Sequence, residues 1–108
     1  MFFADMGKMR FEEAVYAKVK EIPCGQVTTY KEVAIAIGKG KSFRAVGNAL
    51  NRNPYLPTVP CHRVVKSDLS IGGFSKGTRA KKKLLTEEGV KFDGNKVRPE
   101  FLFRFCRS

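Results

Sequence analysis

Apolar residues recur at helical spacing near the start of this chain. Between about Met9 and Glu21 they fall on one side of a helix, in a stripe made of Phe11, Val15, Val19 and Ile22. Pro23 follows, and a proline inside a helix removes a backbone donor and clashes with the preceding turn. The pattern therefore predicts one amphipathic helix that ends before Pro23.

A second, short helix is predicted to begin beside Thr29. Thr29 and Glu32 have the spacing of a capping box, in which each side chain binds a backbone N–H at the other end of the first turn. Gly38 is the predicted end of this helix, because glycine accepts the left-handed backbone that often follows a helix. Its inward side is formed by Val33, Ala34 and Ile37.

A third predicted helix runs from Phe43 to about Asn51. Ser42 precedes it as the candidate N-cap, and Asn53-Pro54 ends it because a residue before proline avoids helical angles. Two short helices joined by a glycine-containing turn have the outline of a helix-turn-helix. Many helical hairpins share this outline, so the pattern alone does not establish DNA binding.

The second half of the chain contains less periodic sequence. Val64-Val65 favour an extended backbone because both residues are β-branched. A fourth helix is predicted over residues 79–88, with Thr78 as its N-cap and Gly89 as its C-terminal stop. We expect this helix to turn Leu84 and Leu85 inward.

A small hairpin is predicted after the fourth helix. Val90-Lys91-Phe92 and Lys96-Val97 flank the turn sequence Asp93-Gly94-Asn95, and we expect the pair to form a wing beside the helix-turn-helix. The tail from Phe101 to Phe105 is apolar enough that we expect it to pack or to meet a partner. The predicted fold is mainly α with a small β-hairpin, a winged-helix-like domain containing a helix-turn-helix.

Length and charge narrow the class of protein. At 108 residues the chain is long enough for one core, and we expect a single domain over residues 1–108. It has 21 Lys and Arg against 10 Asp and Glu, a formal net charge of +11. Such a surplus favours a polyanionic partner; a merely soluble surface and attraction to anionic lipid are the alternatives. Because there is no long apolar run and no signal-peptide pattern, we expect nucleic acid and no membrane.

The three cysteines are widely spaced and odd in number. Their spacing does not match that of a zinc site, so we expect no metal and no cofactor. An unpaired set without a secretion signal is typical of an intracellular protein.

The sequence Pro60-Cys61-His62-Arg63 is the strongest chemical signal in the chain. It places a thiol beside the single histidine and beside a guanidinium, and both are expected to lower the thiol pKa toward the reactive thiolate. Taken alone, the pair is at least as typical of a buried structural cysteine beside a surface histidine.

Several dispersed motifs, taken together, resemble one family, the O6-alkylguanine-DNA alkyltransferases, over roughly residues 9 to 90. The matching motifs, in chain order, are Glu21-Ile22-Pro23, Val27-Thr28-Thr29-Tyr30, Arg44-Ala45-Val46-Gly47, Asn53-Pro54, Pro60-Cys61-His62-Arg63-Val64-Val65, Gly72-Gly73-Phe74-Ser75 and Glu88-Gly89. The resemblance implies irreversible transfer of an alkyl group from O6 of guanine in DNA to a cysteine of the protein.

The resemblance also implies a role for each matching residue. Cys61 would accept the alkyl group, His62 would take the thiol proton through a water molecule, and Glu88 would hold the imidazole. Asn53 would tie the helix-turn-helix to the active-site loop. The substrate pocket would be lined by Val64, Gly73, Phe74 and Ser75.

A last group of roles concerns DNA. By resemblance, Tyr30 would crowd a phosphate and rotate the damaged nucleotide out of the duplex, and Arg44 would fill the gap that it leaves. Ser42, Arg63 and Lys81 are assigned to DNA contacts. The helix would lie in the minor groove of double-stranded DNA and show weak sequence preference.

The chain departs from full-length members of that family. They carry an additional N-terminal domain, and here about eight residues precede the first predicted helix. A subfamily of similar size, the alkyltransferase-like proteins, binds alkylated DNA but has lost the cysteine, whereas Cys61 is present here. We therefore expect a monomeric, single-use alkyltransferase; a non-catalytic damage-recognition protein and a winged-helix regulator are the alternatives.

Overall fold

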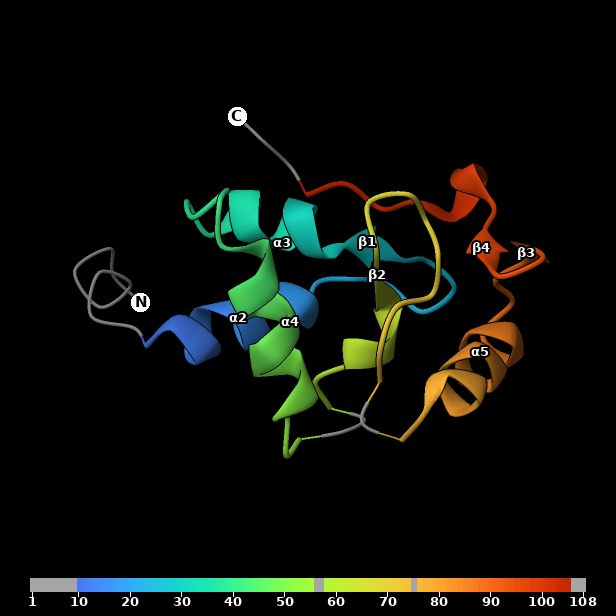
Figure 1. The fold of residues 1–108 in the computed structure, drawn as a ribbon, viewed down its shortest axis with the longest axis horizontal. Helices are drawn as coiled ribbons and strands as arrows, with labels where there is room; N and C mark the ends of the chain where they lie inside the picture. Colours follow the sequence, from blue (N-terminus) through green and yellow to red (C-terminus); the bar gives the residue numbers. More distant parts are fainter. Residues whose placement is uncertain (1–9, 56–57, 75, 106–108) are drawn as a thin grey trace.

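Three helices pack together in the N-terminal half of the protein. The computed structural model describes residues 10–55, 58–74 and 76–105. Helix α2 spans Phe11–Val19, α3 spans Tyr30–Ala36 and α4 spans Phe43–Asn51, and each of the three contacts the other two. Figure 1 shows them side by side at one end of the molecule, with the strands β1 and β2 in the middle and α5 at the other end.

Helix α2 confirms the first amphipathic stripe. Val15 and Val19 are fully buried on its inner side, while the Glu13 carboxylate accepts a 3.0 Å hydrogen bond from the backbone N–H of Arg10 at its start. The helix is shorter than the range predicted, about Met9 to Glu21, because the chain turns at Lys20 ahead of Pro23.

Helices α3 and α4 form the predicted helical pair. The Thr29 hydroxyl accepts from the backbone N–H of Glu32 at 3.1 Å, and Gly38 has a φ of +77° just after α3. Ser42 is the N-cap of α4 by position, but the prediction that its side chain caps the helix was wrong. Its φ and ψ of −101° and 26° lie outside the extended region in which a capping hydroxyl faces the first turn.

Two very short parallel strands connect the helical pair to the Cys61 segment. Strand β1 is Thr28–Thr29 and β2 is Val64–Val65, with Thr28 opposite Val64 and Thr29 opposite Val65. A 3-10 helix over Cys61–Arg63 leads directly into β2. The pairing therefore fixes the reactive segment next to the start of α3.

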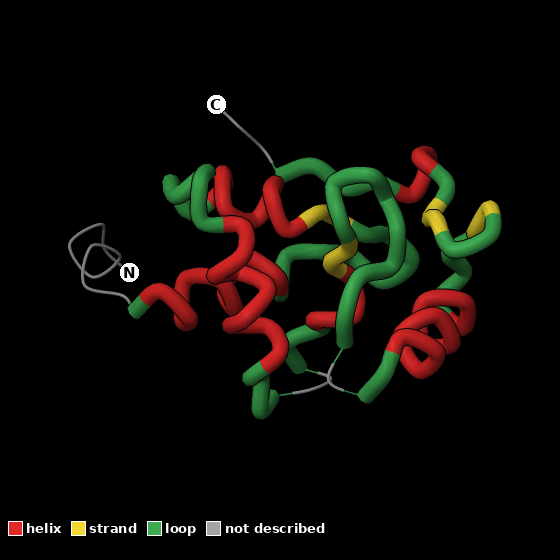
Figure 2. Tube along the Cα trace, in the orientation of Figure 1, coloured by secondary structure: helices red, strands yellow, loops and turns green. Residues whose placement is uncertain are grey.

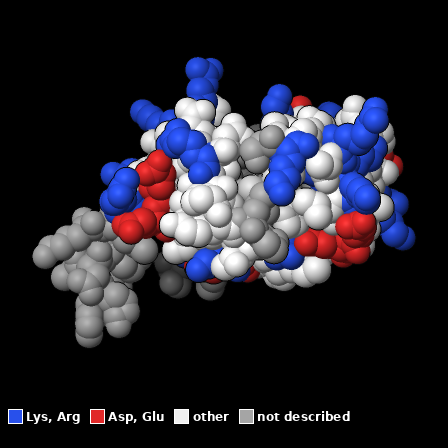
Figure 3. All heavy atoms as spheres, turned by 90° about the horizontal axis from the view of Figure 1, so that it is seen from below, with Lys and Arg blue, Asp and Glu red and all other residues white. Residues whose placement is uncertain are grey.

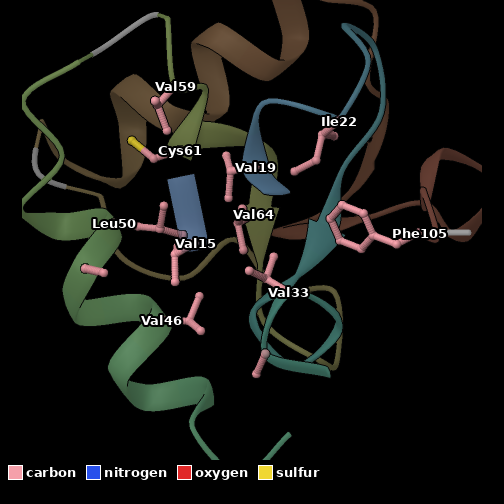
Figure 4. Close-up of a cluster of buried hydrophobic side chains, with 12 residues drawn as sticks. Val15, Val19, Ile22, Val33, Val46, Leu50, Val59, Cys61, Val64 and Phe105 are labelled. Atoms are coloured by element: carbon pink, nitrogen blue, oxygen red, sulfur yellow. The ribbon is translucent and has the colours of Figure 1, made fainter. Parts of the chain in front are cut away.

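One apolar cluster fills the space between these elements. It contains side chains from α2, α3 and α4 together with residues of the Cys61 segment, as Figure 4 shows: Val15, Val19, Ile22, Val33, Val46, Leu50, Val59, Cys61, Val64 and Phe105. In that view Cys61 lies beside Val59. The thiol is thus attached to the packed core and not to a free loop.

Helix α5 spans Thr78–Glu87 and confirms the fourth predicted helix. Its N-cap is Gly77, with a φ of +95°, so the assignment of Thr78 as the cap was wrong by one residue. A β-carbon is strained at that φ, which explains why a glycine fits the capping position. Leu85 is fully buried as predicted, whereas Leu84 is only half-buried.

The predicted hairpin forms from β3, Phe92–Asp93, and β4, Lys96–Val97, with Phe92 opposite Val97. It lies beside α5, at the far end of the molecule from α3 and α4, and not beside the helical pair (Figure 1). The reason is a second apolar cluster that joins hairpin, α5 and strands through Val27, Val65, Leu85, Val90 and Val97.

The apolar tail packs, as expected, along the N-terminal half. Val27 donates its backbone N–H to Phe101 at 2.9 Å and accepts from Phe103 at 2.6 Å. Phe105 is buried, and its ring meets Phe103 edge to face with 5.2 Å between centroids. Figure 2 shows the tail as a loop that passes over the ends of the strands after a short 3-10 helix, Pro99–Phe101.

Candidate active site

The Cys61 thiol lies at the start of the 3-10 helix and is nearly sealed from solvent, with 4% of the residue exposed. Its loop is held by Asn53, which follows α4. The Asn53 amide nitrogen donates to the Val59 carbonyl at 2.8 Å, and its oxygen accepts from the backbone of Tyr55 at 2.8 Å. The same Val59 carbonyl accepts from the Cys61 backbone at 2.8 Å. Asn53 therefore joins the end of α4 to the segment that carries the thiol.

His62 is held from one side by Glu88. Its Nε2 lies 2.9 Å from Oε2 of Glu88, and only 3% of the histidine side chain is exposed. An ionised carboxylate can only accept a hydrogen bond, so Nε2 carries the proton and Nδ1 carries a lone pair. Nδ1 is buried and has no hydrogen-bond partner among the described residues. The arrangement leaves a basic nitrogen available on the residue next to Cys61.

Arg63 binds both oxygens of the Glu88 carboxylate. Its Nε donates to Oε1 at 2.9 Å and its Nη2 to Oε2 at 2.8 Å, while Nη1 donates to the Ile22 carbonyl at 2.9 Å. Only 17% of the Arg63 side chain is exposed. The assignment of Arg63 to DNA contact is therefore corrected: all three types of guanidinium nitrogen are directed inward.

The charges of this network follow from its geometry. Partial burial acts to raise the pKa of Glu88, but the hydrogen bonds from Arg63 and His62 outweigh it and bring that pKa to about 2. Burial lowers the pKa of His62, and the opposing attraction of Glu88 does not restore it. We favour a neutral imidazole despite the short His62–Glu88 contact, because Arg63 already compensates the carboxylate. At neutral pH the base next to Cys61 is therefore unprotonated.

The predicted activation of the Cys61 thiol was wrong in direction. Burial raises the pKa of Cys61, and the lowering effects of the Asn53 hydrogen bond and the Lys81 charge do not offset it. The two residues that follow Cys61 in the sequence do not favour its thiolate, because the Arg63 guanidinium faces Glu88 and the His62 imidazole is neutral. The resting form is therefore the thiol, and a thiolate forms only when a base takes its proton.

This raised pKa gives a test by pH. In a variant with Cys24→Ser and Cys106→Ser, alkylation of Cys61 by iodoacetamide should accelerate about tenfold per pH unit and continue past pH ~8.5, where an ordinary thiol levels off. The sign follows because folding favours the protonated form, so the thiolate fraction at each pH is lower than in the unfolded chain. The check is a rate–pH profile of the native protein beside the same protein in urea. A native profile that levels off at a lower pH than the urea profile would contradict the raised pKa of Cys61.

Lys81 lies inside the protein, with no exposed surface, although it was assigned to DNA contact. That assignment is corrected, because a fully buried ammonium cannot reach a phosphate. Its Nζ is 3.1 Å from the Gly73 carbonyl and 3.3 Å from the Tyr30 hydroxyl, and it sits 5.6 Å from the Tyr30 ring centre. Burial lowers the pKa of Lys81 to about 8. Lys81 thus links the loop that contains Gly72 and Gly73 to Tyr30, the first residue of α3.

Tyr30 contacts both the buried cluster around Cys61 and the protein surface. Its ring packs against the apolar cluster that contains Cys61, and its hydroxyl lies 3.4 Å from the Gly73 carbonyl. Burial raises the pKa of Tyr30 to about 12, so the hydroxyl stays protonated and can donate. Tyr30 is therefore placed to interact with a group that enters between the surface and Cys61.

The four predicted pocket residues are not equivalent. Val64 is completely buried in the core, so its assignment to a pocket wall is corrected. Phe74 is half-buried against the cluster that contains Cys61, and Gly73 is exposed. Ser75 lies outside the described residues.

A cleft of about 670 Å³ opens between α4 and the loop after β2. Its lining comprises Tyr30, Phe43, Arg44, Gly47, Asn48, Asn51, Lys66, Ser67, Asp68 and Gly73. Arg44 is exposed there as expected, whereas Ser42 is half-buried outside the lining. Sequence reasoning missed Asn48 and Asn51. The helical repeat of the correctly predicted α4 would have found them, because residues 44, 47, 48 and 51 share one side.

Positive charge is spread over the surface. Figure 3 shows Lys and Arg side chains distributed across the face seen from below, with Asp and Glu in small groups. Within the described part of the chain no group of three or more His, Cys, Asp and Glu side chains could hold a metal ion. Nor does that part contain a helix that is long and apolar enough to span a membrane.

Comparison with known proteins agrees with this geometry. Residues 10–90 match the family model described as "6-O-methylguanine DNA methyltransferase, DNA binding domain". A methylated-DNA–protein-cysteine methyltransferase of Methanosarcina barkeri is 46% identical over 78 residues, covering 72% of this chain and 49% of the relative. The enzyme of the same name from Saccharolobus solfataricus is 48% identical over 81 residues, covering 75% and 52%. The chain thus spans about half the length of these curated relatives.

Solved structures show the same fold. S. pombe Atl1, in complex with damaged DNA containing O6-carboxymethylguanine, aligns with a TM-score of 0.75 and 31% identity over 96% of this chain and 99% of Atl1. Mycobacterium tuberculosis OGT in complex with DNA aligns with a TM-score of 0.72 and 36% identity over 74% and 50%. Because the family model matches residues 10–90, a range that includes both Cys61 and α4, the protein belongs to the family of the 6-O-methylguanine DNA methyltransferase DNA-binding domain.

Proposed function

We propose that this protein repairs double-stranded DNA by moving an alkyl group from O6 of guanine to Cys61. The observation that carries the proposal is the Cys61-His62-Glu88 arrangement. In it a buried thiol adjoins a histidine whose Nε2 lies 2.9 Å from Glu88 and whose Nδ1 has no hydrogen-bond partner among residues 10–55, 58–74 and 76–105. A nucleophile, a base and a group that orients the base are the parts that nucleophilic catalysis requires.

The transfer balances without any other reactant. Sγ of Cys61 attacks the alkyl carbon, the S–C bond forms as the C–O6 bond breaks, and the electron pair of that bond remains on guanine. The thiol proton passes through a water molecule to Nδ1 of His62 and then to solvent. The departing guanine takes up one proton from solvent, and the Tyr30 hydroxyl, which in the structure donates to the Gly73 carbonyl at 3.4 Å, can instead donate a hydrogen bond to the base. The products are a thioether and unmodified guanine, and the thioether ends the activity of that molecule.

DNA enters through the cleft beside α4. Chemistry on a base edge requires the nucleotide to leave the stack, and Cys61 is too deeply buried to reach a base within a duplex. Arg44 is exposed at the start of α4 and could occupy the space left in the duplex. The Asn48 and Asn51 amides face the same cleft, where they could meet the hydrogen-bonding edges of the minor groove.

Mass spectrometry tests the proposal directly. Incubation with a duplex containing O6-methylguanine should add about 14 Da, the mass of one CH₂, to the peptide that contains Cys61, with one adduct per molecule at most. Cys61→Ala is the control: it should bind the duplex, gain no mass and leave the O6-methylguanine unchanged. No adduct at any ratio of protein to DNA would overturn the proposal.

A second candidate is recognition of damaged DNA without transfer. It is favoured by the likeness to S. pombe Atl1, whose structure was solved in complex with damaged DNA and aligns with a TM-score of 0.75. This candidate predicts tight binding of the O6-methylguanine duplex by both the wild type and Cys61→Ala, with the lesion intact in both. A sequence-specific footprint on undamaged DNA would instead indicate a transcriptional regulator.

A further inference from the structure

An aromatic ring stands exposed at the mouth of the DNA cleft. Phe43, the first residue of α4, is 45% exposed and lines the cleft together with Arg44. Among the described residues, two large hydrophobic side chains are this exposed, and the other, Tyr55 at 57%, does not line this cleft. Phe43 therefore exposes apolar surface to solvent at the proposed site.

The surroundings of Phe43 fit a nucleic acid better than an apolar peptide. Lys66 supplies positive charge for a phosphate and Arg44 a second cation beside Phe43, against one carboxylate, Asp68. Asn48 and Asn51 supply neutral hydrogen-bonding groups. Gly47 lies against the Tyr30 ring, since a β-carbon at this position would be 3.8 Å from the nearest ring carbon, so α4 and Tyr30 meet at the wall of the cleft. An apolar ring within a cationic and amide-lined cleft has the chemistry of a wedge that enters a base step from the minor groove.

Phe43 and Arg44 are placed for two different roles. Successive residues of a helix are turned by about 100° around its axis, so Phe43 and Arg44 enter the cleft from different directions. Arg44 can replace only the flipped nucleotide, so the base step next to it remains open to a second side chain. A second group beside it can hold the adjacent base pair in place.

We propose that Phe43 is a second DNA-deforming residue, an apolar wedge that inserts at the base step next to the flipped nucleotide while Arg44 occupies the gap. This inference rests on the proposed binding of lesion-containing duplex and adds a residue that the family motifs did not mark. Contact between an aromatic side chain and a base is worth about 1–3 kcal/mol, which corresponds to about 5- to 150-fold in affinity.

Binding measurements test the wedge. In a Cys61→Ala background, Phe43→Ala should weaken binding to a duplex with O6-methylguanine about tenfold, and Phe43→Leu, which keeps an apolar wedge, should recover most of the loss. Tyr55→Ala is the matched control and should stay within twofold. Because Phe43 meets no phosphate, Phe43→Ala should leave the salt dependence unchanged, whereas Lys66→Ala should lower its slope by about one.

Fluorescence locates the insertion. With 2-aminopurine in place of the base next to the lesion, the Cys61→Ala protein should raise the fluorescence by unstacking it, and adding Phe43→Ala should abolish the rise. A change below twofold in affinity, or a rise that persists without the ring, would overturn the inference. Alkyl transfer by the wild type is read separately as the mass adduct. Transfer with no effect of Phe43 therefore rejects the wedge alone, and a wild type that binds no duplex rejects both.

Discussion

Replacing Glu88 by glutamine is expected to slow alkyl transfer about 1000-fold while the chain still folds. A glutamine amide can donate to Nε2 of His62, and Nε2 then becomes the acceptor and Nδ1 carries the proton. The nitrogen that should receive the thiol proton is no longer basic. A comparable loss of the orienting carboxylate in a Ser-His-Asp triad costs about 10⁴ in rate through the wrong tautomer. The substitution also leaves the Arg63 guanidinium without its ionised partner, so we expect a lower melting temperature.

Single-turnover transfer from an O6-methylguanine duplex, measured below the melting temperature of the variant, checks this result. Glu100→Gln is the matched control, because it also removes a carboxylate paired to an arginine, Arg98 at 3.3 Å, in the exposed 3-10 helix after the hairpin. The control should transfer at the wild-type rate. Duplex affinity should be unchanged in Glu88→Gln. A loss of rate that is matched by the loss of affinity would show that Glu88 supports the fold of the DNA site and not the histidine.

Local signals explain why the helices could be predicted. Helix α4 was predicted with its observed bounds, Phe43–Asn51, because its apolar period and the Asn53-Pro54 boundary are both contained in the local sequence. The strand Thr28–Thr29 was not predicted. Two residues carry no readable period, and β1 exists because Val64 and Val65 pair with it from a distant part of the chain.

The errors at the site arose because the sequence does not show which residues Arg63 and Lys81 contact in the fold. Arg63 and Lys81 were read as surface charges because their sequence shows only a cation. In the structure Arg63 faces Glu88, and Lys81 is sealed against Tyr30 and Gly73. The direction of the Cys61 pKa depended on these long-range choices, since a guanidinium that faces a carboxylate no longer favours a neighbouring thiolate.

The raised thiol pKa changes where the rate must come from. Even a thiol pKa of ~6 would give a net gain of only about 2- to 3-fold at pH 7, because nucleophilicity falls as the thiolate fraction rises. A buried, protonated thiol gives no such gain at rest. Alignment of sulfur with the alkyl carbon can contribute ~7–11 kcal/mol, so the proposed transfer would depend on the packed position of Cys61 and on removal of its proton by His62.

Replacing Lys81 by methionine should lower the transfer rate about 30-fold at pH 7 without unfolding the protein. Methionine has a similar length and removes the cost of burying an ammonium, while the Gly73 carbonyl keeps the Tyr30 hydroxyl as a donor at 3.4 Å. The variant loses the donor that joins the Gly73 carbonyl to the Tyr30 hydroxyl, at 3.1 and 3.3 Å, and the positive charge that favours the Cys61 thiolate. A hydrogen bond to a charged group is worth about 1.5–3 kcal/mol, which covers the expected loss.

The pH dependence separates this role from a packing role. Because the pKa of Lys81 is about 8, the wild type loses the ammonium as the pH rises through that value, and the ratio of wild-type to Lys81→Met rates should then fall toward one. A variant that merely packs badly would keep the same ratio from pH 7 to 9. Lys82→Met is the matched control, since the next residue of the same helix donates to the Gly94 carbonyl at 3.0 Å, beside the hairpin and away from Tyr30. It should change neither the rate nor its pH profile, so an equal loss in both variants would point to the positive charge of α5 and not to Lys81 within the site.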